Sequence, residues 1–159
     1  MIFVTVGTQL PFERLIKSMD MWAKENASIE VFAQIGDTEY MPEFMGYTSS
    51  IGPVEYQSYI DRANIVVSHV GMGTVITGLE SGKQLVLMPR LHALGEHRND
   101  HQLGSAERFG HFDGVQIVHD AEELNFALDK VVAEGAGGAG SVELKASDNL
   151  INVLRTFAG

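Results

Sequence analysis

The chain has 159 residues, of which 45% are hydrophobic and 20% charged, with a formal net charge of −10 and no cysteine. This length and composition predict one globular domain with a core of its own. The negative charge argues against general nucleic-acid binding and direct docking on anionic lipid, since both depend on Lys and Arg. The lack of cysteine excludes disulfides and thiolate zinc sites.

The amino-terminal stretch predicts a strand followed by a helix. Residues 2–6 are apolar, Gly7 and Thr8 interrupt the run, and apolar residues then recur at helical spacing over 12–22. The start lacks the basic leader of a signal peptide, and no apolar run reaches the ~18–20 residues that cross a bilayer. The lack of cysteine fits a cytoplasmic protein, which is the location we expect. Because a helix start attracts anions, Gly7 and Thr8 are candidate ligand-binding residues; alternatively, Gly7 only forms a tight turn.

The middle of the chain alternates strands with helices. We expect strands at 29–35, 47–51, 64–68 and 84–88, and helices at 55–62 and 74–81. The strands at 64–68 and 84–88, joined through one helix, form a βαβ unit, which is nearly always parallel and right-handed. Ligands of parallel sheets gather beyond the carboxyl ends of the strands. The polar residues that follow these two strands are therefore the candidate site.

The first of these polar stretches is a glycine turn, Ser68-His69-Val70-Gly71-Met72-Gly73-Thr74. It fails the spacing of the dinucleotide fingerprint and lacks the P-loop lysine. Paired glycines before a helix still let backbone N–H groups reach phosphate oxygens, with Thr74 adding a hydroxyl. The alternative is that glycine is needed only for the backbone conformation of the turn. Further along the helix, Thr77 and Glu80 are candidates for ribose contact, unless Glu80 is simply a solvated charge.

The second polar stretch covers residues 89–102. Four basic or titratable side chains lie close together there in an otherwise acidic chain, which favours an anionic small ligand: Arg90, His92, His97 and Arg98.

The end of this stretch, residues 96–102, has three interpretations. If it is helical, His97 and His101 lie one turn apart and could bind a metal, although Arg98 occupies the place of the zinc-protease glutamate. It could also be an ordinary solvated helix start. In the third interpretation, Asp100, His101 and Gln102 recognise sugar hydroxyls through their donors and acceptors.

The remainder predicts a helix up to 109, a strand at 115–118 and a helix at 121–133. A glycine-rich flexible link at 135–141 then leads to an amphipathic C-terminal helix at 142–159, which packs either on its own sheet or on another chain. This alternation of strands and helices is typical of an α/β domain with three layers and a parallel sheet.

Three motifs together resemble the carboxyl-terminal, donor-binding domain of glycosyltransferase family 28. They are Phe3-Val4-Thr5-Val6-Gly7-Thr8, the turn Ser68–Thr74, and Asn99-Asp100-His101-Gln102. The likeness covers residues 1–118 and is greatest to small bacterial exopolysaccharide transferase subunits. It extends to the catalytic subunit of the eukaryotic two-chain dolichol-linked N-acetylglucosaminyltransferase. It implies a Rossmann-like domain equivalent to the C-terminal half of a GT-B enzyme, with 1–159 as a single nucleotide-sugar-binding domain.

The resemblance also implies residue roles. Gly7, Thr8, Gly71, Gly73 and Thr74 would cradle the donor diphosphate, with His69 in the same motif. The donor sugar would be held by Asp100, His101 and Gln102, and uracil by the backbone near 52–54. An acidic ribose contact of the family falls at Thr77, with Glu80 one turn later, so the ribose contact stays open between them. Arg90, His92 or Arg98 would face the diphosphate, and Arg98, Asp100 and His101 are the candidate catalytic residues.

The function implied is that of the donor-binding catalytic subunit of a two-component glycosyltransferase. It would move a hexosyl group from a UDP-sugar to a lipid-linked saccharide in polysaccharide or glycolipid synthesis, with inversion and without a metal or cofactor. A membrane-anchored partner would bind the acceptor, supply the base and hold this chain peripherally at the membrane. The alternatives are a non-catalytic enhancer subunit that activates a partner transferase, and a metal-dependent hydrolase using His97 and His101.

Overall fold

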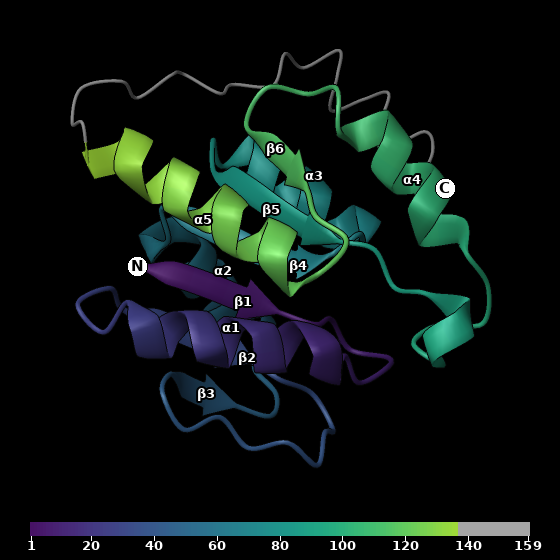
Figure 1. Cartoon of the computed structure of the whole chain (residues 1–159), viewed down its shortest axis with the longest axis horizontal. Helices are drawn as coiled ribbons and strands as arrows, with labels where there is room; N and C mark the ends of the chain where they lie inside the picture. The colour runs from purple at the N-terminus through teal and green to yellow at the C-terminus, as the bar shows by residue number, and fades with distance from the viewer. Residues whose placement is uncertain (137–159) are drawn as a thin grey trace.

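The computed structural model describes residues 1–136, and the predicted C-terminal helix at 142–159 lies outside the described residues. At its centre is a six-stranded sheet in the order β3-β2-β1-β4-β5-β6, with every neighbouring pair parallel (Figure 1). The strands are β1 (Ile2–Thr5), β2 (Val31–Gln34), β3 (Gly46–Thr48), β4 (Ile65–His69), β5 (Gln84–Met88) and β6 (Val115–Ile117). This order reverses direction between β1 and β4, as in Rossmann-like folds.

Helices cover both faces of the sheet. They are α1 (Glu13–Glu25), α2 (Pro53–Arg62), α3 (Met72–Glu80), α4 (His101–Phe109) and α5 (Ala121–Ala136), with a short 3-10 helix η1 (His92–Leu94). The predicted three-layer α/β fold is thus confirmed. Because α5 runs to Ala136, the first two residues of the link predicted at 135–141 are helical, and the rest of the link lies outside the described part of the chain.

Alternate strand residues feed two separate cores. On one face, Val4 and Val67 pack under α1 and α5, which lie in front of the sheet in Figure 1. On the other face, Phe3, Val66 and Leu85 pack under α2, α3 and α4. Strands buried on both faces explain the continuous apolar runs in the sequence.

The predicted strands and helices all form in the described residues, with shifted ends. The strand expected at 47–51 is the short edge strand β3, and the helix expected at 74–81 begins two residues earlier at Met72. One conditional expectation is wrong: residues 96–100 are not helical, and α4 begins only at His101. Gly95 ends η1 in a left-handed conformation (φ 71°), and the chain then turns so that the Glu96 side chain is buried.

A buried carboxylate fixes the long irregular loop before β3. Asp20 of α1 is fully buried and accepts hydrogen bonds from the Tyr40 hydroxyl (2.6 Å) and from the backbone N–H groups of Glu43 (3.0 Å) and Phe44 (2.8 Å). A carboxylate is costly to bury unless such hydrogen-bond donors satisfy it. The loop is therefore attached to α1 by specific contacts.

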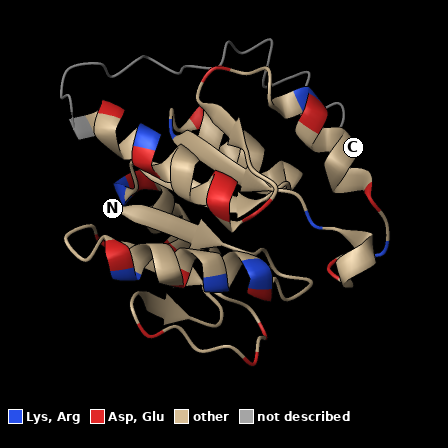
Figure 2. Cartoon of the chain, in the orientation of Figure 1, with Lys and Arg blue, Asp and Glu red and all other residues tan. Residues whose placement is uncertain are grey.

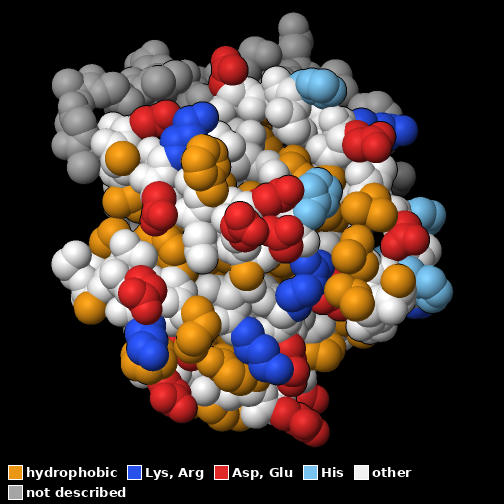
Figure 3. Space-filling model, in the orientation of Figure 1, with side chains coloured by type: hydrophobic (Ala, Val, Ile, Leu, Met, Phe, Trp, Pro, Cys, Tyr) orange, Lys and Arg blue, Asp and Glu red, His pale blue; other side chains and the backbone are white. Residues whose placement is uncertain are grey.

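The surface mixes charges of both signs. Figure 2 shows acidic and basic residues close together along α1, where Glu13 and Lys17 form an exposed ion pair (3.6 Å). Histidine side chains reach the surface on the side of η1 and α4 (Figure 3), where His92 and His101 are exposed. None of the helices within residues 1–136 combines the length and apolarity that a membrane span requires.

Candidate functional site

The candidate site lies at the carboxyl edge of the sheet, where the chain leaves β1, β4 and β5. The turn after β1 holds Gly7 and the turn after β4 holds Gly71, and the two strands are neighbours in the sheet. The segment 89–102 follows β5, which is the next strand along. The three sequence motifs therefore meet at one edge, beside the point where the strand order reverses.

The turn after β1 is held from inside the fold. Gly7 has φ 77°, a left-handed conformation that favours glycine. Its carbonyl accepts a hydrogen bond from the Gln34 side-chain amide (3.1 Å), which also donates to the carbonyl of Ser49 (3.1 Å). Thr8 is exposed beyond this anchored residue. Gln34 thus ties the first turn to the loop that precedes α2, and the sequence analysis did not single it out.

His69 stands between the two glycine turns. A Cβ added at Gly7 would lie 2.8 Å from the His69 Nε2 atom, and a Cβ added at Gly71 would lie 2.7 Å from the same atom and 2.3 Å from Cε1. The imidazole therefore occupies the space that two alanine side chains would need. On its other side, His69 Nδ1 contacts the Gln102 side-chain amide nitrogen (3.1 Å). Glycine at both turns makes room for the ring.

Burial keeps His69 neutral. Burial lowers the pKa of the His69 imidazole from its ordinary 6.5 to about 4, and the nearby Arg90 and His97 act in the same direction. At neutral pH the ring therefore carries one proton on one nitrogen. It is available to a ligand as a polar group without a charge of its own.

The amino terminus of α3 offers unpaired backbone donors. Its N-cap Gly71 is extended, no side chain caps the helix, and its first turn contains no acidic residue. The first N–H groups of a helix have no partner within the helix, and the helix dipole favours an anion there. Gly73 is exposed, and nothing lies within 4 Å of the position of its missing Cβ. The predicted phosphate-binding turn thus has open space directly over its backbone.

Thr74 and its successors on α3 differ in their access to this site. The buried Thr74 hydroxyl pairs with the Tyr56 hydroxyl of α2 (3.1 Å). Thr77 is half-buried and Glu80 is exposed at the last residue of the helix. At 1.5 Å rise per residue, Thr77 lies about 4.5 Å and Glu80 about 9 Å along the axis from Thr74. Thr77 is therefore the nearer of the two candidates for ribose contact.

Arg90 has a different position from the expected one. Its side chain is buried, and its guanidinium donates hydrogen bonds to the carbonyls of Val6 (2.6 Å), Leu10 (2.9 Å), Pro11 (2.8 Å) and Glu96 (3.3 Å). The sequence predicts direct contact with a diphosphate, but this guanidinium is enclosed beneath the loop after β1. Although burial lowers its pKa to about 10, Arg90 remains charged at neutral pH. It stabilises the loop that carries Gly7 and Thr8.

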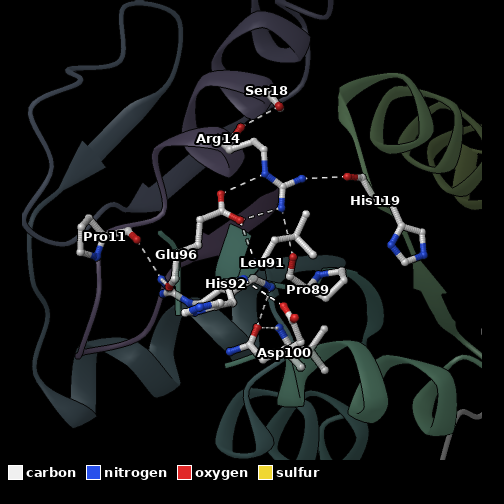
Figure 4. Close-up of polar contacts among 12 residues, drawn as sticks. Pro11, Arg14, Ser18, Pro89, Leu91, His92, Glu96, Asp100 and His119 are labelled. Carbon is white, nitrogen blue, oxygen red and sulfur yellow. Dashed lines mark hydrogen bonds and ion pairs between the residues drawn. The ribbon is translucent and has the colours of Figure 1, made fainter. Parts of the chain in front are cut away.

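A second arginine fixes the segment after β5. Arg14 of α1 forms a bidentate ion pair with Glu96 (3.0 and 2.9 Å) and donates to the carbonyls of Pro89 (3.1 Å) and His119 (2.7 Å), as Figure 4 shows. The Glu96 carboxylate also accepts the Leu91 N–H (3.0 Å). Neither Arg14 nor Glu96 was predicted to matter, because they lie 82 positions apart and leave no local signal.

The residues expected to grip the sugar are split by the start of α4. Asp100 and His101 are exposed, and Asp100 accepts the backbone N–H of His92 (3.0 Å). Arg98 is also exposed. Gln102, in contrast, is buried, and its Oε1 atom accepts the N–H groups of Val70 and Arg90. Asp100 and His101 are open to a ligand, whereas the Gln102 side chain joins the ends of β4 and β5.

The pairing of His97 with His101 on one helical face is not formed. His97 precedes α4, and its Nδ1 atom is buried without a hydrogen-bond partner among the described residues. Within residues 1–136, no group of three His, Asp or Glu side chains lies together as a metal ligand set. The geometric basis for a metal site at these two histidines is therefore removed.

The strand order and the two glycine turns define a Rossmann-like domain of the nucleotide-binding class. The chain belongs to the glycosyltransferase family 28 C-terminal domain family, whose model matches residues 1–146. No curated protein sequence matches it.

Solved GT-B glycosyltransferases share the fold. The glycotransferase of kitacinnamycin matches with a TM-score of 0.68 and 18% identity over 99% of this chain and 40% of that chain. MurG of Acinetobacter baumannii matches with a TM-score of 0.61 and 16% identity, and the match covers 97% of this chain and 49% of MurG. The glycosyltransferase VinC, solved in complex with dTDP, matches with a TM-score of 0.59 and 15% identity, and the match covers 99% of this chain and 39% of VinC. The chain thus spans less than half the length of each of these proteins, and it matches the C-terminal domain of the GT-B fold.

Proposed function

We propose that this chain is the donor-binding catalytic subunit of a two-component glycosyltransferase. It transfers a hexosyl group from a UDP-sugar to a lipid-linked saccharide in polysaccharide or glycolipid synthesis. The observation that carries this proposal is the neutral His69 imidazole between Gly7 and Gly71, next to the uncapped start of α3. These groups supply hydrogen-bond donors of the kind that bind a diphosphate.

In the proposed reaction, the main role of this chain is to stabilise the UDP leaving group. In an inverting transfer, the acceptor hydroxyl oxygen bonds to the anomeric carbon while the bond from that carbon to the diphosphate oxygen breaks. The hydroxyl proton goes to a base, and the negative charge that develops on UDP is stabilised by donors already in place. Here the donors are the α3 amides and His69. Arg98, Asp100 and His101, which are exposed around the start of α4, are the candidate catalytic and sugar-binding residues.

The partner belongs to the same proposal. A membrane-anchored chain binds the lipid-linked acceptor, provides the base and holds this chain at the cytoplasmic surface of the membrane. The support is the membership of this chain in the glycosyltransferase family 28 C-terminal domain family and its resemblance to the two-chain members of that family.

Titration of the chain with UDP and with UDP-glucose, UDP-galactose, UDP-glucuronate and UDP-N-acetylglucosamine tests donor binding. A ligand at 100 times its Kd adds about 2.7 kcal/mol to the free energy of unfolding, which a thermal shift detects. One of the sugar nucleotides should raise the melting temperature of the chain more than the others do. If neither this chain nor its complex with the partner responds to any of them, the proposal is wrong.

Gly73→Ala adds a methyl group where the structure has open space, so it should block phosphate approach without harming the fold. Loss of one hydrogen bond to a charged group costs about 1.5–3 kcal/mol, or roughly a 10- to 100-fold weaker Kd for UDP. Gly104→Ala is the matched control, because Gly104 is also exposed with nothing within 4 Å of its missing Cβ, but lies within α4. It should leave UDP affinity unchanged.

The same variant separates catalysis from a purely supporting role. In the reconstituted pair, Gly73→Ala should reduce transfer while the complex stays intact by size-exclusion chromatography. Unchanged transfer would instead support the enhancer subunit, which activates a partner transferase without using the donor.

A further inference from the structure

Gln102 lies beneath the site, in contact with the ring that stands between the two glycine turns. We propose that Gln102 is a positioning residue whose side-chain amide donates to His69 Nδ1 and thereby keeps the ring proton on Nε2. The Nε2–H, which lies between Gly7 and Gly71, then serves as a fixed donor to the diphosphate. This inference rests on the proposed function. It adds the contact that fixes which nitrogen of His69 donates to the diphosphate.

The orientation of the Gln102 amide follows from its other contacts. Its Oε1 atom receives two backbone N–H groups, from Val70 (3.2 Å) and from Arg90 (3.0 Å). A flipped amide would direct its NH₂ group at both of these donors, so only the oxygen fits there. The amide nitrogen, which can only donate, therefore faces His69 Nδ1 at 3.1 Å. A nitrogen that accepts a hydrogen bond carries no proton, and the single proton of the neutral ring lies on Nε2.

The charges around His69 support the neutral form. The Arg90 guanidinium and the His97 side chain are the titratable groups that act on it electrostatically, and both oppose a second positive charge. The carboxylate of Glu96 is engaged by Arg14 and by the Leu91 N–H. The ring is thus a donor at Nε2 without being a cation.

This role differs from the one that the resemblance implies for Gln102, which is direct contact with the donor sugar. Both acceptor positions of its Oε1 atom and one of its two amide protons are already used inside the protein. Its second amide proton remains for a donor sugar, which the exposed Asp100 and His101 can also contact.

The tautomer can be measured without any ligand. Nitrogen-15 NMR of the full chain with labelled histidine, at pH 7, distinguishes protonated from unprotonated ring nitrogens; the His69 signals are assigned by their loss in His69→Gln. We expect Nε2 protonated and Nδ1 unprotonated. A ring protonated on Nδ1, or on both nitrogens, overturns the proposal whether or not UDP binds.

Gln102→Glu tests the functional consequence with a nearly isosteric change. The carboxylate still accepts the Val70 and Arg90 N–H groups, but its second oxygen must accept from Nδ1, so the neutral ring loses its Nε2 proton. Only the doubly protonated ring restores the Nε2–H. UDP affinity of the variant relative to wild type should therefore fall from pH 5 to pH 8.5, as the doubly protonated ring loses a proton.

A control separates the tautomer from the added negative charge. Gln9→Glu places the same charge in the exposed loop after β1, and its UDP affinity relative to wild type should stay constant over that pH range. A constant ratio for Gln102→Glu as well would overturn the proposal. Absence of UDP binding by wild type, both alone and in complex with the partner, with the Nε2–H tautomer present, would instead refute the proposed function and leave the contact between Gln102 and His69 established.

Discussion

The turns after β1 and after β4 look alike in sequence but differ in how their backbone groups are used. In the first, the carbonyls of Val6, Leu10 and Pro11 all accept from Arg90, and that of Gly7 accepts from Gln34. In the second, Gly71 leads directly into α3, and no side chain caps the helix. The turn after β1 is therefore a fixed border of the site, because its carbonyls are paired inside the fold. The turn after β4 carries the backbone N–H groups that can bind a ligand.

The helices that follow the two turns reinforce this difference. The first turn of α1 contains Glu13, and a hydrogen bond from the Thr38 hydroxyl lowers the pKa of its carboxyl group. A negative charge at that helix start disfavours a bound anion, whereas the first turn of α3 has no acidic residue. The two glycine motifs therefore predict one anion site at α3, bordered by the first turn.

The largest expected effect is a loss of stability when the loop after β1 loses its contacts with Arg90. Arg90→Met removes the donors of four carbonyls inside the fold. Since a buried polar group left unpaired costs about 1–3 kcal/mol, we expect the free energy of unfolding to fall by about 3–5 kcal/mol in urea denaturation. Arg98→Met is the matched control, because Arg98 is exposed, and it should change stability by less than about 0.5 kcal/mol. Equal losses for both variants would contradict the assigned role of Arg90.

A smaller loss should come from the second turn. Gly71→Ala places a methyl group 2.3 Å from the His69 Cε1 atom, so the ring must move. Overpacking of this kind typically costs about 1–3 kcal/mol. Gly73→Ala, with open space at its Cβ position, should leave stability nearly unchanged. Thermal unfolding of the two variants side by side compares these effects, and similar melting temperatures for both would show that the ring does not need the space at Gly71.

The fold and the place of the site could be predicted because their signals are local. Residues 65–67 and 85–88 are unbroken apolar runs that end in polar residues, and they form the buried strands β4 and β5 with His69 and Arg90 at their ends. The position of the glycine turns and polar residues after these apolar runs marked the candidate site. Their convergence at one edge then followed from the parallel topology, without any knowledge of side-chain contacts.

The direction in which each polar side chain points could not be predicted. Arg90 reaches the carbonyl of Val6, 84 residues away, and Arg14 pairs with Glu96 across 82 residues. Such pairs form only after the sheet has brought loops together, so nothing in the neighbouring sequence distinguishes an inward arginine from one that faces a ligand. The contacts of Gln102 could not be predicted for the same reason, since its Oε1 atom accepts the backbone N–H groups of Val70, after β4, and of Arg90, after β5.

The smallest expected effect is the pH dependence of stability that His69, at the end of β4, contributes. Burial lowers the pKa of His69 from 6.5 to about 4, so between these values the unfolded chain binds more protons than the folded one. The stability contributed by neutral His69 is thus complete above pH 6.5 and is lost as the pH falls toward 4. From pH 7 to pH 5, wild type should lose about 1–2 kcal/mol more than His69→Gln in parallel urea titrations. Since the turn after β1 has no histidine, equal losses in both proteins would place the acid-sensitive group elsewhere and remove this distinction between the two turns.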